Sequence, residues 1–138
     1  MANTLQLEIV TPESRAYNDQ VEMVVLPAIE GEMGVYPMHI PLITQIKPGE
    51  LVVTKNGQQI ALAVGEGFVE VTGDKVSVLV DMALTEHEID EAAAEDAIRR
   101  AEARLKEEHV GGEEAAMVQA SIAKSLAQLH VKRRRRGM

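Results

Sequence analysis

One stretch of this 138-residue sequence decides the fold class: Leu51-Val52-Val53-Thr54-Lys55-Asn56-Gly57-Gln58-Gln59-Ile60-Ala61-Leu62-Ala63-Val64. Apolar residues recur at every second position on both sides of Asn56-Gly57, which is the period of a β-strand with one buried face. Asn56 and Gly57 both tolerate the positive φ that a tight two-residue turn requires. The stretch therefore predicts a β-hairpin.

The same period of two continues through the first 84 residues. We predict strands at 5–9, 21–26, 51–53, 60–64, 69–71 and 76–80. Turn signals separate these segments, at Thr11-Pro12, Asn18-Asp19, Lys47-Pro48-Gly49 and Gly73-Asp74. Many short strands at this spacing favour an antiparallel sandwich or barrel. Because the segment 21–26 is largely apolar on both faces, we expect part of the sheet to be covered on both sides.

From Thr85 the apolar residues take the period of a helix. Thr85 and Glu88 have the spacing of a capping box, so we expect a first helix to begin there. Its apolar stripe is Ile89, Ala93, Ala97, Ala101 and Leu105. Gly111-Gly112 should end it, and a second helix should follow. The stripe of the second helix is Ala115, Val118, Ile122, Leu126 and Leu129.

The alanines on both stripes predict two antiparallel helices that approach closely. An alanine seam buries little apolar area, so only a few kcal/mol should hold such a hairpin and it could open. The expected fold class is thus α+β in two segregated parts. An antiparallel β-sandwich should occupy residues 1–84, and an antiparallel two-helix hairpin with a basic tail should occupy residues 85–138.

The net charge of −8 is unevenly distributed along the chain. Residues 1–84 and residues 85–114 each carry 11 acids and 4 bases, whereas residues 115–138 carry 6 bases and no acid. The basic end either pairs with the acidic segment before it or reaches an acidic partner. Its tail, Lys132-Arg133-Arg134-Arg135-Arg136, would also suit nucleic acid or anionic lipid, or it could be a solvated end.

Composition excludes several classes of function. The chain has no cysteine, which removes disulfides and thiolate metal or redox sites. Three aromatic residues are too few for a surface that stacks on nucleic-acid bases. No phosphate-binding loop, metal-binding histidine spacing or catalytic constellation is present, so we expect neither enzymatic activity nor a cofactor. Without a signal peptide or an apolar run of about 20 residues, the chain is expected to be cytosolic.

A long segment around two turn glycines resembles a known family. The segment reads Leu26-Pro27-Ala28-Ile29-Glu30-Gly31-Glu32-Met33-Gly34-Val35-Tyr36-Pro37-Met38-His39-Ile40-Pro41-Leu42. Other segments match in the family's order, at 7–13, 47–51, 67–71, 76–81 and the helix opening Ile89-Asp90. Together they resemble the epsilon subunit of bacterial F-type ATP synthase, over essentially the whole chain.

The resemblance implies a β-sandwich followed by two helices, and a non-catalytic subunit of the rotor stalk. Such a subunit couples rotation of the c-ring to ATP synthesis and inhibits ATP hydrolysis through its C-terminal helices. The implied partners are the gamma subunit, the c-ring, and the alpha and beta subunits through those helices, with no nucleic acid. Contact with the membrane would come only through the complex, at the cytoplasmic face of the bacterial inner membrane.

The resemblance also implies roles for particular residues. The implied c-ring contact consists of Glu30, Gly31, Glu32, Met33, Gly34, Tyr36, His39, Pro41 and Leu42. Gly111 and Gly112 would form the regulatory hinge. The inhibitory tail would be Lys132, Arg133, Arg134, Arg135 and Arg136. The competing hypothesis is a free-standing binding module whose basic tail contacts nucleic acid or anionic lipid.

Departures from the family pattern bear on nucleotide binding. Members that bind nucleotide carry Ile-Asp-x-x-Arg-Ala at the start of the first helix, and here Ile89 and Asp90 are followed by Ala93 in place of the arginine. Leu84 stands where those members use an acid. With only Arg100 and its neighbours to supply positive charge, the site is degenerate and the chain is expected to bind ATP weakly or not at all. Ala28 and Met38 also replace usual glycines.

Overall fold

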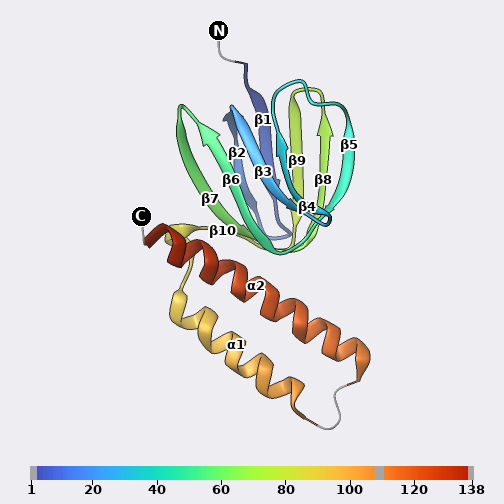
Figure 1. Cartoon of the computed structure of the whole chain (residues 1–138), viewed down its shortest axis with the longest axis vertical. Coiled ribbons are helices and arrows are strands. Elements are labelled where there is room, and N and C mark those ends of the chain that lie inside the picture. The colour runs from blue at the N-terminus through green and yellow to red at the C-terminus, as the bar shows by residue number, and fades with distance from the viewer. Residues whose placement is uncertain (1–2, 108–110, 137–138) are drawn as a thin grey trace.

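The computed structural model of the chain describes residues 3–107 and 111–136. A ten-stranded β-sandwich is followed by two antiparallel α-helices that extend from one of its ends, as Figure 1 shows. The predicted fold class is therefore confirmed. The strands are β1 (Leu5–Val10), β2 (Arg15–Val21), β3 (Met23–Ala28), β4 (Gly31–Val35), β5 (Leu42–Ile46), β6 (Gly49–Lys55), β7 (Gln58–Val64), β8 (Gly67–Thr72), β9 (Lys75–Val80) and β10 (Ala83–Thr85). The helices are η1 (Glu86–Glu88, a 3-10 turn), α1 (Glu91–Leu105) and α2 (Gly112–Arg136).

The strands form one hydrogen-bonded sheet that folds over on itself. Its order is β10-β7-β6-β3-β5-β8-β9-β1-β2, and β4 pairs with β3 outside this path. The two halves meet where β3 and β5 share the pair Ala28 and Ile46. All neighbouring strands are antiparallel except β1 and β9, which run parallel with Leu7 opposite Val76. This pair is the one departure from the predicted antiparallel sandwich.

The predicted hairpin at Asn56-Gly57 is present as β6 and β7. Lys55 pairs with Gln58 across a two-residue turn. Asn56 has φ 52° and Gly57 has φ 76°, the positive values that its tight turn requires. Local turn chemistry thus fixes the register of this hairpin.

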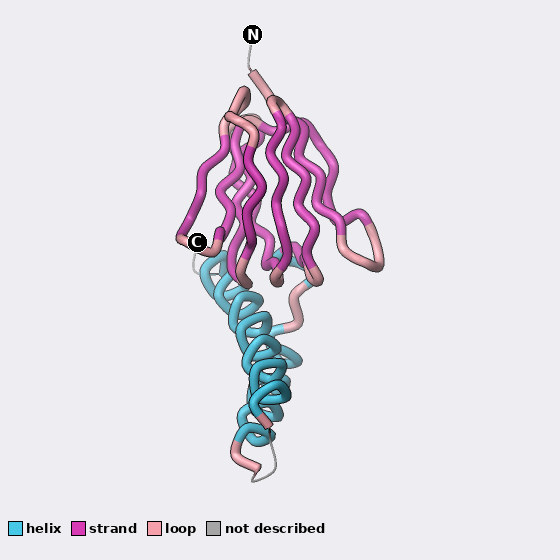
Figure 2. The backbone as a smooth tube through the Cα atoms, turned by 90° about the vertical axis from the view of Figure 1, so that its right-hand side faces the viewer, coloured by secondary structure: helices cyan, strands magenta, loops and turns pink. Residues whose placement is uncertain are grey.

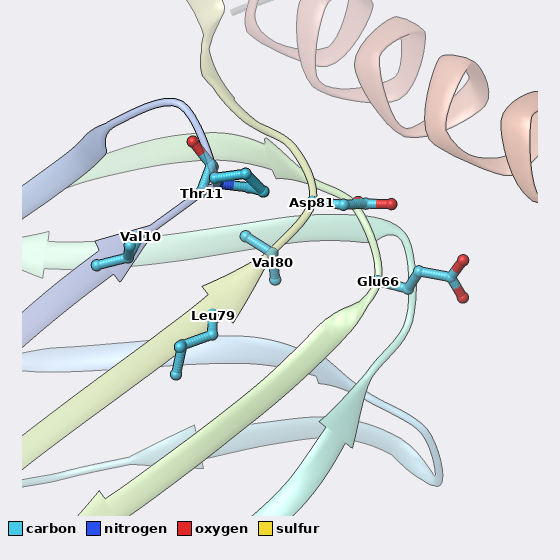
Figure 3. A pocket seen from close by; sticks show the side chains of 7 residues that line it. Val10, Thr11, Glu66, Leu79, Val80 and Asp81 are labelled. Carbon is cyan, nitrogen blue, oxygen red and sulfur yellow. The ribbon is translucent and has the colours of Figure 1, made fainter.

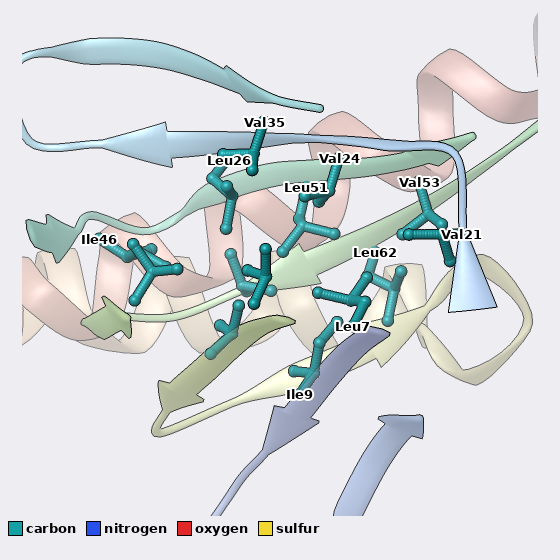
Figure 4. Packing of buried hydrophobic residues seen from close by; sticks show 14 of the residues in the cluster. Leu7, Ile9, Val21, Val24, Leu26, Val35, Ile46, Leu51, Val53 and Leu62 are labelled. Carbon is teal, nitrogen blue, oxygen red and sulfur yellow. The ribbon is translucent and has the colours of Figure 1, made fainter. Parts of the chain in front are cut away.

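The hydrophobic core lies between the two halves of the sheet. Alternate side chains from β1, β3, β6 and β7 point into it, as Figure 4 shows. The core residues are Leu5, Leu7, Ile9, Val21, Val24, Leu26, Val35, Ile46, Leu51, Val53, Leu62, Val64, Val69, Val71, Val76, Val78 and Val80. All of them precede the helices, so the sandwich has a core of its own.

Two of the strand predictions need correction. The segment 21–26 is not one strand, because β2 ends at Val21 and β3 begins at Met23. Strands β2, β4, β5 and β10 were not predicted, because each has too few alternating apolar residues to mark a buried face. The strand covered on both faces is β7 rather than 21–26, since Ala61, Leu62, Ala63 and Val64 are all buried.

The helical part begins differently from the prediction. The capping box of Thr85 is present, but it caps the 3-10 turn η1 and not an α-helix. The Glu88 carboxylate accepts hydrogen bonds from the Thr85 backbone N–H at 2.9 Å and from its hydroxyl at 2.8 Å. These bonds lower the pKa of Glu88. Helix α1 begins later, at Glu91, where the Asp90 side chain accepts the Ala93 N–H at 3.0 Å.

Helix α2 packs against both α1 and the sandwich. A second apolar cluster joins Ala127 and Val131 of α2 to Ala61 and Ala63 of β7 and to Ile89. The predicted single stripe on α2 is therefore wrong in part, and Leu126, one of its members, is exposed. A helix with two neighbours distributes its apolar residues over two faces, which a single stripe does not describe.

Candidate functional site

The residues predicted to contact the c-ring lie along one edge of the sandwich. Glu30 is in the turn between β3 and β4, at the end of the sandwich from which the helices extend, as Figure 2 shows for the helices. The loop 36–41 follows β4 and lies at the opposite end, because Val24 pairs with Val35 and Leu42 with Val71. The five residues of β4 separate the two ends by roughly 17 Å.

These nine residues differ in how far their side chains are exposed to solvent. Met33 and Leu42 pack against the hydrophobic core and so have structural roles. Glu30, Glu32 and Tyr36 are exposed. The remaining members are Gly31, Gly34, His39 and Pro41, of which Gly34 and Pro41 are exposed.

The loop at the far end of β4 is apolar and exposed. The Met38 side chain is 81% exposed, and Tyr36 and Ile40 are exposed beside it in sequence. Met38 has φ 67°, a left-handed conformation that costs a residue with a Cβ about 1–2 kcal/mol. A glycine would adopt this conformation without that cost. The His39 Nδ1 donates to the Ile40 carbonyl at 2.7 Å.

A second exposed apolar surface lies on the outer face of β5, β8 and β9. Its three largest members are Ile43, Phe68 and Leu79, which are 68%, 53% and 55% exposed. Phe68 and Leu79 are cross-strand partners, and Ile43 lies opposite Glu70 on the same strand pair as Phe68. We call these three residues the β5–β8–β9 face. Helix α2 covers β6 and β7, in the other half of the sheet.

A pocket of about 370 Å³ continues this face toward the helices. Figure 3 shows Val10, Leu79 and Val80 on adjacent strands, with Glu66 and Asp81 at the rim. The lining is almost wholly apolar, and the two carboxylates offer an anionic ligand no positive charge. The pocket is suited to a side chain of a protein partner.

The β5–β8–β9 face was not predicted from the sequence, although a signal for it is present there. The segment Val76-Ser77-Val78-Leu79-Val80 places an apolar residue on the outer face of a strand whose inner face is already apolar. Phe68 does the same on β8. An outward leucine next to an outward phenylalanine becomes informative only once β8 and β9 are known to pair.

The residues of the degenerate nucleotide site have structural roles. Ile89 is buried in the second apolar cluster. Asp90 caps α1, so its carboxylate is already hydrogen-bonded. The Arg100 Nε lies 3.4 Å from Asp96, one turn away, and is about 15 Å along the helix axis from Asp90. The structure does not bring Asp90 and Arg100 together.

The basic tail pairs with acids of this same chain. Arg133 contacts Glu91 at 2.9 Å and Glu95 at 2.5 Å, both on α1. Arg134 pairs with Glu50 of β6, and the Lys132 Nζ lies 3.2 Å from a Glu86 carboxylate oxygen. In this conformation the basic end therefore takes the first of its two predicted alternatives. The side chains of Arg135 and Arg136 lie outside the described residues.

The predicted hinge lies where the connection between the two helices meets α2. Helix α1 ends at Leu105, with Lys106 as its C-cap, so Gly111-Gly112 does not end it. Gly112 is instead the first residue of α2. The hinge role of these glycines stays a prediction, as does the division of the chain after residue 84, which falls within β10.

Within residues 3–107 and 111–136, no three His, Asp or Glu side chains are grouped so as to hold a metal ion. None of the helices in the described part of the chain is long and apolar enough to cross a bilayer.

Comparison with protein families gives two adjacent matches. Residues 4–86 match the family described as the ATP synthase delta/epsilon chain, beta-sandwich domain. Residues 87–133 match the ATP synthase delta/epsilon chain, long alpha-helix domain. The two families together cover nearly the whole chain.

Individual relatives agree with the family matches. The chain is 42% identical over 132 residues to an ATP synthase epsilon chain of Dehalococcoides mccartyi, covering 96% of this chain and 94% of the relative. It is 43% identical over 129 residues to one from Halorhodospira halophila, covering 92% and 91%.

Two solved structures share the fold. A chain in the Euglena gracilis mitochondrial ATP synthase, OSCP/F1/c-ring in rotational state 1, superposes with a TM-score of 0.77 at 21% identity, covering 92% of this chain and 79% of that one. A chain in the Tetrahymena thermophila central stalk and c-ring gives a TM-score of 0.61 at 10% identity, covering 93% and 96%.

Proposed function

This chain belongs to the ATP synthase delta/epsilon family, and we propose that it is the epsilon-type subunit of the central stalk in a proton-translocating F-type ATP synthase. The observation that carries the proposal is the 42% identity to an ATP synthase epsilon chain over 96% of this sequence. The subunit has no active site of its own. It transmits rotation between the c-ring and the catalytic sector, at the cytoplasmic face of a bacterial inner membrane.

The gamma subunit docks on the β5–β8–β9 face in this proposal. Three large apolar side chains exposed on neighbouring strands are typical of a surface that a protein partner covers. The adjacent apolar pocket adds a recess for a partner side chain. Burying one isoleucine contributes about 1.5–3 kcal/mol, so this face can supply much of the affinity for gamma.

Changing Ile43 to aspartate should weaken binding to gamma by at least about tenfold, because it places a charge in an apolar interface and removes buried area. Ile60→Asp is the matched control, since Ile60 is a partly exposed strand residue on β7, in the other half of the sheet. Co-purification with gamma and its dissociation rate are the measurements. Equal retention of both variants would contradict the assignment of this face.

The same purification tests the function as a whole. A stalk subunit should be recovered with gamma in a large ATPase complex. A free-standing module should elute at its own size and be retained on heparin. Arg133 and Arg134 make ion pairs within this chain, so less positive charge is available to bind a polyanion such as heparin.

The c-ring contacts the β4 edge in this proposal. Glu30 and Glu32 are exposed there, and the apolar loop 36–41 lies one strand length away. A partner that touches both must therefore lie along β4 and not at one tip of the hairpin. Exposed carboxylates at the rim of an interface tune orientation and association more than affinity.

Glu32→Lys should uncouple proton pumping from ATP hydrolysis. Reversing the charge on the β4 edge opposes the orientation in which the ring docks, so hydrolysis should persist while pumping in membrane vesicles falls several-fold. Glu13→Lys serves as control, because it makes the same reversal at the exposed turn between β1 and β2. Normal pumping by Glu32→Lys would remove Glu32 from the contact.

The C-terminal helices act as a brake on hydrolysis in this proposal. Opening the hairpin would carry α2 and its basic tail to an acidic surface of the alpha and beta subunits. Helix α2 is suited to this movement, because its contact with the sandwich consists mainly of alanine and valine side chains and ion pairs. Two states within a few kcal/mol of each other are what such a switch needs.

A further inference from the structure

One side of α2 carries a row of polar side chains that reach the sandwich and the 3-10 turn. The contacts are Lys124 with Asp81 at 3.4 Å, Gln128 with the Met82 sulfur at 3.0 Å, Lys132 with Glu86 at 3.2 Å, and Arg134 with Glu50. Lys124, Gln128 and Lys132 are four residues apart, on successive turns of the helix, and Arg134 lies two residues after Lys132. They flank the Ala127 and Val131 contacts with β7, so the whole second half of α2 is docked.

Glu50 is the most enclosed carboxylate of this row. Its side chain is only 10% exposed, and one oxygen pairs with an Arg134 guanidinium nitrogen. The other oxygen is buried and has no hydrogen-bond partner among the side chains that the structure describes. A carboxylate withdrawn from water in this way depends on its cation more than an exposed one does. Arg134 supplies a cation to this enclosed carboxylate.

Neighbouring arginines of the tail hold different parts of the molecule. Arg133 bridges Glu91 and Glu95 on α1, and its pKa is raised by hydrogen bonds to Glu91 and then to Glu95. Arg134 faces the other way, toward β6. The end of α2 is thus tied to the first helix and to the sandwich at the same point.

We infer that Glu50, Glu91 and Glu95 form an electrostatic latch that competes with the acidic partner for Arg133 and Arg134. This inference rests on the proposed brake. The guanidinium groups that the open state would present to another subunit are occupied by carboxylates of this chain in the closed state. One guanidinium cannot serve both, so the tail becomes available only when the latch opens.

The latch predicts that substituting its acids and substituting its arginines have different effects on ATP hydrolysis. Removing an acid weakens only the closed state, because every base of the tail is kept. Removing an arginine weakens the closed state and the braked state together, so its effects partly cancel. Acid variants should therefore strengthen the brake, which is not expected if these ion pairs are ordinary surface contacts.

The test uses Glu50→Gln and the double variant Glu91→Gln/Glu95→Gln in the assembled enzyme. Each should lower the ratio of closed to open hairpin by about three- to tenfold, since partly buried charged pairs contribute more to stability than exposed ones. ATP hydrolysis should fall accordingly. The matched control is Asp74→Asn, which removes the same charge at the exposed turn between β8 and β9, at the end of the sandwich opposite the helices.

A second measurement separates the latch from the brake. In the isolated full chain, amide hydrogen exchange in the second half of α2 should be faster for Glu50→Gln than for Asp74→Asn. Exchange equal to that of the control would overturn the latch. Faster exchange with unchanged hydrolysis would overturn the proposed brake and leave the latch as a docking contact. Faster exchange with slower hydrolysis would support both.

Discussion

Removal of residues 86–138 is expected to raise ATP hydrolysis by the assembled enzyme several-fold while proton coupling is retained. The deletion takes away both helices and the basic tail, so the proposed brake has nothing to insert between the other subunits. The sandwich should remain folded, because all the residues of its main core lie between Leu5 and Val80. Hydrolysis and vesicle acidification, measured on the same preparation, check the two parts of this result.

The deletion also uncovers Ala61 and Ala63 on β7, which α2 covers. Exposure of these two alanines is a second difference from the full enzyme, separate from loss of the brake. A shorter deletion of residues 133–138 is therefore the control. It removes the four arginines and leaves the Ala127 and Val131 contacts in place. The shorter deletion should give a smaller rise, because the tail serves the closed state as well. If both truncated enzymes assembled and hydrolysed ATP at the rate of the full enzyme, the brake would be absent.

Gly67→Ala is expected to cause a large loss of stability. A Cβ at Gly67 would lie 1.9 Å from the Leu79 carbonyl oxygen and 2.8 Å from the Val80 Cα. Both atoms belong to the backbone of β9, which pairs with β8, so no side-chain rotation can relieve the overlap. The two strands must separate, at a cost of about 3 kcal/mol.

Thermal unfolding of the isolated chain measures this effect. A loss of about 3 kcal/mol corresponds to a fall in Tm of roughly 10 °C for a domain of this size. Gly34→Ala is the matched control within a strand, because its Cβ would meet only the terminal methyl of Met23, at 3.3 Å. That methyl can move, so the control should change Tm little. Equal Tm values for the two variants would show that the backbones of β8 and β9 lie farther apart at Gly67 than the structure indicates.

Local sequence signals account for the parts of the fold that were predicted correctly. The Asn56-Gly57 hairpin follows from two turn residues and the strands beside them, since all of its partners are close in sequence. The capping residues Thr85 and Glu88 were identified for the same reason. The element that they cap was not predicted correctly, because a capping box can close a 3-10 turn as readily as it begins a long helix. Helix α1 is capped instead by Asp90.

Contacts between distant segments could not be derived from periodicity. Glu50 and Arg134 are 84 residues apart, and nothing in the sequence around either one indicates the other. The docking of α2 on β7 had a weak signal in Ala61 and Ala63, which make β7 apolar on both faces. A strand covered on both faces implies a covering element, but its identity required the structure. The residues of the proposed c-ring contact came from family resemblance, and the separation of its two ends by β4 came from strand register.

The parallel pairing of β1 with β9 has a consequence for how the chain folds during its synthesis. Strand β1 emerges first, yet its partner on one side is made of residues 75–79. At a synthesis rate of about 5–20 residues per second, the interval is roughly 3–13 s. Until then β1 can pair only with β2, and a lone hairpin is marginally stable in water. Leu5, Leu7 and Ile9 therefore stay accessible to chaperones until nearly all of the sandwich has been translated, and the high contact order of this closure makes the first strand one of the last to be fixed.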